Sequence, residues 1–136
     1  VYKSLPLLLL LISPLLASDV INQRQDSMQD FNKLMRAANQ SLKNGEIEGL
    51  AEIYGDIESI MKTYPTLFPD DSFDGKTKAS NDIIVNREAF NQIANDTAEW
   101  AALAKIAAEN NDLEALQQHQ QNLYGSCKSC HSRFKN

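Results

Sequence analysis

The chain has few cysteines, glycines and prolines, and so lacks the composition of disulfide-rich proteins and of proteins with glycine-rich nucleotide-binding loops. It contains two cysteines, five glycines and four prolines among 136 residues. The two cysteines lie three positions apart, so a disulfide between them would close a very short loop and would stabilise nothing distant. The sequence also contains no Gly-rich phosphate-binding loop, internal repeat or low-complexity tract.

Basic residues are in the minority as well. Lysine and arginine number 13 against 18 aspartates and glutamates, which gives a formal net charge of −5. An acidic protein of this kind is a poor candidate for binding nucleic acid or an anionic membrane surface. We therefore expect no nucleic-acid partner.

No apolar run is long enough to cross a bilayer. The longest, from Leu5 to Leu16, has twelve residues, whereas a spanning helix needs roughly 20. Lys3 precedes this run and the small residues Ala17 and Ser18 follow it, which is the order found in secretory signal peptides. We interpret residues 1–17 as a signal peptide, with the cleavage site uncertain by one or two positions, and expect a periplasmic protein.

The remaining residues, 18–136, are expected to form one all-α domain. Apolar residues recur at helical spacing over residues 19–44, 46–63, 86–110 and from 111 to the C-terminal region. Asn111 with Glu114 resembles a capping box at the start of the last helix. Short breaks at 44–45 and 110–111, with one long connection at 64–85, predict an antiparallel four-helix bundle.

The sequence Cys127-Lys128-Ser129-Cys130-His131 carries the most specific chemistry. Thioredoxin-type redox chemistry would require a preceding strand, and none is expected here. Structural zinc would require four ligands, and the chain offers only these three and the distant His119. Ordinary packing of two cysteines is a further alternative.

The interpretation that we favour is covalent haem attachment. A Cys-x-x-Cys-His motif attaches haem c, with Cys127 and Cys130 forming thioethers to the vinyl groups and His131 binding the iron. Residues i and i+3 lie about 5–6 Å apart on one helix face, which suits two neighbouring vinyl groups. One motif implies one haem and one iron per chain.

Three stretches resemble class II c-type cytochromes, the family of cytochrome c′ and its low-spin relatives. The motif lies at the extreme C-terminus, and "CKSCHSRFK" is similar to the usual ending of that family. "RQDSM", Arg24 to Met28, resembles a segment near the mature N-terminus of the family. "YPTLFPDDS", residues 64–72, resembles the segment after the second helix of the low-spin members. The resemblance covers essentially all of residues 18–136.

The resemblance implies two functions, which differ at Met28. In the low-spin branch the methionine sulfur binds iron opposite His131, and the protein is an electron carrier. In cytochrome c′ the residue at this place only shields a vacant site, and the five-coordinate haem binds gases such as nitric oxide or carbon monoxide. The "LFPDDS" segment favours electron transport through a His/Met haem as the expected function. Core packing is the alternative for Met28.

The resemblance also assigns Arg24 to a haem propionate, which a guanidinium suits through its two parallel donors. A solvated surface arginine is the alternative. Redox proteins are the expected partners, with small gases and a second copy of the chain as further candidates. No Ser/His or carboxylate–His pairing accompanies the haem motif, so we expect that the protein is not an enzyme.

Overall fold

The computed structural model describes residues 17–136, apart from the side chain of Ser18. The predicted signal peptide lies outside the described residues, except for Ala17. The described chain forms the α-helices α1 (Ala17–Lys43), α2 (Leu50–Thr63), α3 (Asp82–Val85), α4 (Arg87–Glu109) and α5 (Leu113–Phe134), and the 3₁₀ helix η1 (Tyr64–Leu67). None of the helices within this part of the chain is long and apolar enough to cross a membrane.

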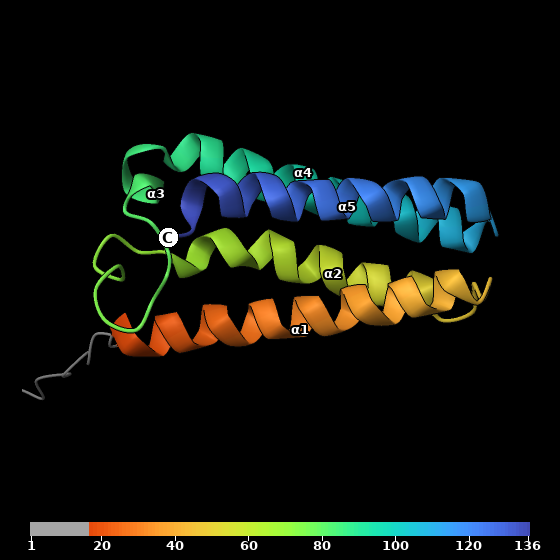
Figure 1. The fold of residues 1–136 in the computed structure, drawn as a ribbon, viewed down its shortest axis with the longest axis horizontal. Helices are drawn as coiled ribbons and strands as arrows, with labels where there is room; N and C mark the ends of the chain where they lie inside the picture. Colours follow the sequence, from red (N-terminus) through yellow and green to blue (C-terminus); the bar gives the residue numbers. More distant parts are fainter. Residues whose placement is uncertain (1–16) are drawn as a thin grey trace, which may run out of the picture.

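The four long helices form an antiparallel bundle, as the sequence predicted. Helices α1 and α4 run in one direction, and α2 and α5 run in the other (Figure 1). Helix α1 packs against α2 and α5, and α4 packs against the same two helices. The connection between α2 and α4 lies at the same end of the bundle as the C-terminus (Figure 1).

Helix α1 is amphipathic and ends where the sequence indicated. Its buried residues recur every three or four positions and include Phe31, Met35, Ala38 and Leu42. Gly45 adopts a left-handed φ of 69°, and the amide of Glu46 donates to the carbonyl oxygen of Ser41 at 2.9 Å. This six-to-one bond is the Schellman arrangement that closes a helix, and glycine adopts the required φ without steric cost.

The second helix begins four residues later than the sequence predicted. Residues 46–47 have no regular structure and 48–49 form a turn, and Gly49, which precedes α2, has a left-handed φ of 82°. A residue in this conformation cannot continue a right-handed helix, so α2 starts at Leu50. The connection at 64–85 also contains more structure than expected, because η1 and α3 lie within it.

The start of α5 differs in the same way. Asn111 has a positive φ of 53° and closes the end of α4, where the amide of Asp112 donates to the carbonyl oxygen of Ala107 at 2.9 Å. The side chain of Asp112 accepts a hydrogen bond from the amide of Ala115 at 3.1 Å and is the N-cap. The predicted capping box of Asn111 and Glu114 is therefore wrong, since the left-handed backbone places Asn111 outside the helix.

Small residues on α4 allow the helices to pack closely. Ala101 and Ala104 are fully buried in the main core, together with Leu50, Tyr54 and Ile57 of α2. The alanines of α4 therefore face neighbouring helices.

One polar network crosses this core. The Tyr54 hydroxyl donates to Oε1 of Gln120 at 2.8 Å, and Nε2 of Gln120 donates to the carbonyl oxygen of Met35 at 3.3 Å. These bonds join α2, α5 and α1 and satisfy polar groups that would be costly to bury alone.

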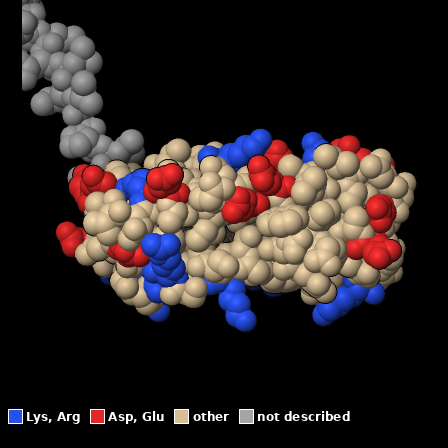
Figure 2. Space-filling view, turned by 90° about the horizontal axis from the view of Figure 1, so that it is seen from above, with Lys and Arg blue, Asp and Glu red and all other residues tan. Residues whose placement is uncertain are grey.

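Charge is distributed in small groups over the visible surface. Figure 2 shows basic and acidic side chains interleaved along the bundle, with no continuous basic area on the visible face. This distribution agrees with the formal charge of −5.

Candidate functional site

A large cavity opens at the end of the bundle where the connection meets the C-terminal half of α5. Its volume is about 660 Å³, which lies within the range of small-molecule and cofactor sites. Helix α1 lines it with Arg24 and Met28, the connection with residues 75–79, and α5 with Cys130 and His131. Residues from distant parts of the sequence therefore meet in one cavity.

A narrower cavity of about 30 Å³ adjoins the first and extends into the bundle. Cys127 lines this inner space, and Met28, Cys130 and His131 line both cavities. The structure thus brings the three residues of the predicted haem-attachment motif together with Met28.

The two cysteines are half-buried thiols at neutral pH. Burial raises the pKa of Cys130 to about 11, and the neighbouring Cys127 acts in the same direction. Burial also raises the pKa of Cys127, partly opposed by a backbone hydrogen bond. Because the thiolate is the form that exchanges disulfides, these raised pKa values disfavour thioredoxin-type redox chemistry. Within residues 17–136, no three His, Cys, Asp or Glu side chains gather as a metal-binding group.

His131 follows Cys130 on the last turn of α5 and lines both cavities. Partial burial lowers the pKa of its imidazole, and the positive charge of Lys135 lowers it further. Both effects favour the neutral ring, which is the form that ligates a metal ion. Two thiols at i and i+3 with an adjacent imidazole, all lining the cavities, fit the attachment of haem c.

The wall that α1 contributes to the inner cavity is apolar. Met28 is partly buried and Phe31 is 1% exposed, and both pack in the main core cluster. The lining also includes Met61 of α2 and Tyr64 of η1. Burial raises the pKa of Tyr64 to about 12, so its hydroxyl remains neutral at physiological pH.

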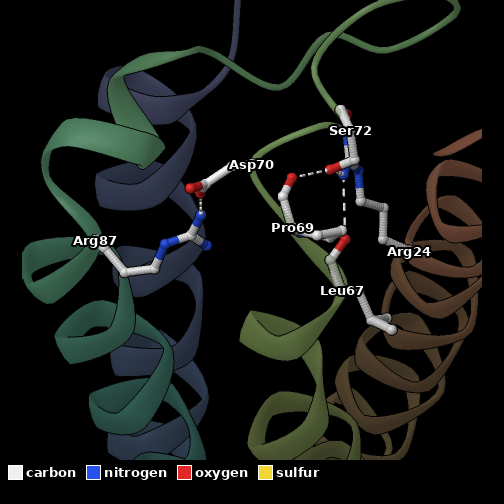
Figure 3. Close-up of polar contacts among 6 residues, drawn as sticks. All are labelled: Arg24, Leu67, Pro69, Asp70, Ser72 and Arg87. Atoms are coloured by element: carbon white, nitrogen blue, oxygen red, sulfur yellow. Dashed lines mark hydrogen bonds and ion pairs between the residues drawn. The ribbon is translucent and has the colours of Figure 1, made fainter.

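Arg24 is buried and bound to the connection. It is 3% exposed, although its side chain lines the large cavity. Its Nη1 donates to the carbonyl oxygen of Leu67 at 3.1 Å and to Oγ of Ser72 at 2.7 Å (Figure 3). Its Nη2 donates to the carbonyl oxygen of Ser72 at 2.7 Å and to Oγ1 of Thr77 at 2.9 Å. Burial lowers the pKa of Arg24, yet an arginine side chain stays protonated in proteins.

The alternative of a solvated arginine is therefore wrong. The predicted contact with a haem propionate stays a prediction. The four hydrogen bonds above use the Nη–H groups of Arg24, so such a contact would use Nε–H.

An aromatic cluster holds the connection against the bundle. The rings of Phe68 and Phe90 meet edge to face with centroids 4.8 Å apart, and those of Phe90 and Phe134 do so at 5.3 Å. The guanidinium of Arg24 lies 4.4 Å from the centre of the Phe68 ring. Edge-to-face pairs and cations over rings are favourable arrangements. The "LFPDDS" segment is thus explained by packing on Arg24 and α4.

Sequence reasoning missed two basic residues of the cavity wall, Lys76 and Lys78. Lys76, Lys78 and Lys135 line the large cavity, and no aspartate or glutamate is among its lining residues. Two backbone hydrogen bonds join these segments, from Ser80 N to Phe134 O at 2.8 Å and from Asn136 N to Lys78 O at 2.7 Å. The two lysines at 76 and 78 come from an irregular connection, so no periodic signal in the sequence could have placed them here.

His119, the distant residue considered as a zinc ligand, belongs to another part of the molecule. Its ring lies 5.9 Å from that of Trp100 on α4. Neither of the two cavities described above includes His119 in its lining.

Comparison with known proteins points to one family. A family model described as Cytochrome C′ matches residues 19–135. A cytochrome c′ of Rhodospirillum rubrum is 38% identical over 80 residues, which make up 58% of this chain and 54% of that protein. The match therefore spans about half the length of this relative.

Solved structures show the same fold. Cytochrome c prime from Shewanella frigidimarina has a TM-score of 0.82 at 22% identity, covering 88% of this chain and 96% of the other. Cytochrome c′ from Rubrivivax gelatinosus has a TM-score of 0.80 at 19% identity, with coverage of 88% and 97%. A ferrous variant of cytochrome c prime from Alcaligenes xylosoxidans, solved with bound NO, has a TM-score of 0.76 at 19% identity, with coverage of 88% and 95%.

These findings overturn the function expected from the sequence. The chain matches cytochrome c′, so the expected electron carrier with a His/Met-ligated haem is wrong. The physical reason lies in the two features that suggested it. The "LFPDDS" segment holds Arg24 and packs on α4, and therefore does not report on iron ligation. Met28 lies on the apolar face of α1, where a methionine serves as a wall as readily as a ligand.

Proposed function

Because the chain belongs to the cytochrome c′ family, we propose that it binds small gas ligands such as nitric oxide or carbon monoxide at a five-coordinate haem. The family carries covalently attached haem c with iron, and this chain has the two cysteines required. This is a binding function rather than a catalysed reaction. The signal-like residues 1–17 favour a periplasmic location. A redox partner and a homodimer stay predictions.

In this proposal, Cys127 and Cys130 would hold the haem through thioethers, and His131 would bind its iron. When bound, the haem would supply an iron that can take up a gas molecule. The observation that carries the proposal is the apolar inner cavity, where Met28 and Phe31 of α1 share a lining with His131 of α5.

In this proposal, helix α1 controls access to the inner cavity. Met28 and Phe31 restrict entry to small uncharged molecules and exclude water from this cavity. Tyr64 adds a hydroxyl to the lining, and its pKa of about 12 keeps it a neutral hydrogen-bond donor. The related NO complex from Alcaligenes xylosoxidans supports the choice of nitric oxide as a test ligand.

Covalent attachment is tested first. Denaturing electrophoresis with haem staining should give one positive band, and mass spectrometry should find one added haem per chain. The double variant Cys127→Ala/Cys130→Ala should lose the band, because both thioethers are gone. A band that survives this change would contradict the assignment of the cysteines.

Gas binding is tested by absorption spectroscopy of both oxidation states. We expect a high-spin spectrum for the ferrous protein and a new spectrum on addition of carbon monoxide. A low-spin ferrous protein that resists carbon monoxide, together with the sulfur-to-iron charge-transfer band in the ferric state, would refute the proposal.

A further inference from the structure

Arg24 is a buried cation whose hydrogen-bond acceptors are all neutral. Its four Nη–H donors bind the carbonyl oxygens of Leu67 and Ser72 and the hydroxyls of Ser72 and Thr77. We call Arg24, Leu67, Ser72 and Thr77 the Arg24 latch. The Ser72 hydroxyl in turn donates to the carbonyl oxygen of Pro69 at 2.7 Å, which directs its lone pairs toward Arg24 (Figure 3).

Among residues 17–136, no carboxylate pairs with the guanidinium of the latch. Asp70, two residues before Ser72, accepts a hydrogen bond from Arg87 of α4 at 2.9 Å, on the side away from Arg24 (Figure 3). The ion pairs found within residues 17–136 are Lys62–Glu58, Arg87–Asp70 and Arg133–Asp82, so Arg24 has no acidic partner among the described residues. A buried charge is costly without a counter-ion, and in the haem-bound protein the propionate that the resemblance assigns to Arg24 would supply one.

The position of this charge gives it an effect on the cavity. Arg24 lines the same cavity as Met28, Cys130 and His131. Because the residue is 3% exposed, dissolved salt screens its guanidinium much less than it screens a surface lysine. Its field therefore acts on whatever the cavity holds.

We infer that Arg24 has two separable roles: it fixes the connection as a wall of the haem cavity, and its charge raises the reduction potential of the haem. The inference rests on the proposed function, in which a haem occupies this cavity. Reduction adds one electron to the iron, so a fixed positive charge nearby favours the ferrous state. Carbon monoxide binds ferrous iron, so a higher reduction potential favours the form of the protein that binds this gas.

The first role follows from where the latch holds the chain. Residues 75–79 line the cavity, and the latch binds positions 67 and 72 before this stretch and position 77 within it. Gln25 adds a hydrogen bond to the carbonyl oxygen of Lys76 at 2.9 Å. Without these bonds to α1, the wall would open locally more often.

Two variants of the holoprotein separate the roles. Arg24→Gln removes both the charge and most of the donors, whereas Ser72→Ala/Thr77→Val keeps the charge and removes two acceptors. Hydrogen exchange of the peptide covering residues 68–79 should become about tenfold faster or more in both variants, since each loses at least two of the bonds that hold the wall. The reduction potential should fall only in Arg24→Gln.

A surface lysine provides the matched control. Lys78 also lines the cavity but is exposed, so Lys78→Gln should lower the potential by an amount that shrinks between about 0.05 and about 0.5 M salt. The difference in reduction potential between the wild type and Arg24→Gln should persist over the same range of salt concentration. A difference that vanishes with salt would place the effect on the surface and overturn the inference.

Two further outcomes would overturn it. One is an Arg24→Gln protein with the wild-type potential, and the other is a Ser72→Ala/Thr77→Val protein whose potential falls equally far. If Arg24→Gln does not fold, Arg24→Lys replaces it, because a buried lysine can lose its charge as the pH rises and cannot span four acceptors. We expect faster exchange and a potential that falls more steeply with rising pH than that of the wild type, and a pH dependence equal to that of the wild type with an unchanged potential would refute the charge. Failure of the wild type to bind carbon monoxide would refute the proposed function alone.

Discussion

Met28 and Met35 lie seven residues apart on the same helix and occupy different surroundings. Met35 is 3% exposed within the main core, and its carbonyl oxygen accepts a hydrogen bond from Gln120. Met28 is partly buried and lines both cavities. At the scale of single residues, substitutions at these two positions therefore test access to the cavity and packing of the core separately.

Met28→Ala should increase the rate at which carbon monoxide binds the ferrous protein, because it removes part of the wall of the inner cavity. The high-spin absorption spectrum should not change. Met35→Ala should leave the gas-binding rate unaltered and destabilise the protein by about 2–5 kcal/mol, as expected for truncation of a buried methionine. Stopped-flow spectroscopy and urea unfolding measure the two effects, and a slower rate in Met28→Ala would contradict the wall assignment.

The burial of Tyr54 leads us to expect that the folded protein loses stability at alkaline pH. Burial raises the pKa of its phenol in the folded protein, with Tyr124 as a smaller cause in the same direction. The stabilisation is fully present below the unfolded pKa of about 10 and is lost as the pH rises above it, because the unfolded chain then releases the proton more easily. The free energy of unfolding should therefore fall above about pH 10.

Tyr54→Phe should make that fall shallower. At pH 7 the variant should be less stable by about 1–3 kcal/mol, since Oε1 of Gln120 loses its buried donor. Urea unfolding from about pH 7 to about pH 11 measures both effects. Tyr124→Phe, at a side chain that is 46% exposed, should change the alkaline fall much less, because Tyr124 is only the smaller cause of the raised pKa of Tyr54. Parallel curves for wild type and Tyr54→Phe would show that Tyr54 does not cause the alkaline loss.

At the scale of elements, α5 depends on the cap at its first turn. Asp112→Ala should destabilise the protein by about 0.5–2 kcal/mol, because the amide of Ala115 loses its side-chain acceptor. Asn111→Gly should be neutral or stabilising, since Asn111 already has a positive φ and makes no cap bond to α5. Thermal unfolding measures both variants. A larger loss in Asn111→Gly than in Asp112→Ala would restore the capping box that the sequence suggested.

At the scale of the whole molecule, the bundle depends on small residues where α4 packs against its neighbours. Ala101 is fully buried, so Ala101→Leu should cost about 1–3 kcal/mol by forcing α4 outward. Glu99→Leu, at an exposed position two residues earlier, should change the free energy of unfolding by less than about 0.5 kcal/mol. Denaturant unfolding compares them, and equal stability of the two variants would contradict close packing at Ala101.

The sequence by itself determined the four long helices and the residues of the haem motif. Helical periodicity is a local property, and Cys127, Cys130 and His131 lie within one turn and a half of α5, so neither requires knowledge of distant contacts. The second and the last long helix begin later than the sequence predicted, after Gly49 and Asn111. The left-handed backbone of these two residues depends on how the chain turns between packed helices, which the local sequence does not show.

Only the tertiary structure decided which groups surround Arg24 and Met28. The partners of Arg24 lie 43 to 53 residues away, in a connection with no periodic pattern, and the lysines at 76 and 78 come from that same connection. Met28 and Met35 share one apolar face and differ only in whether a cavity or a packed helix lies opposite. Such differences arise from the folded arrangement of several segments, which no local stretch of sequence contains.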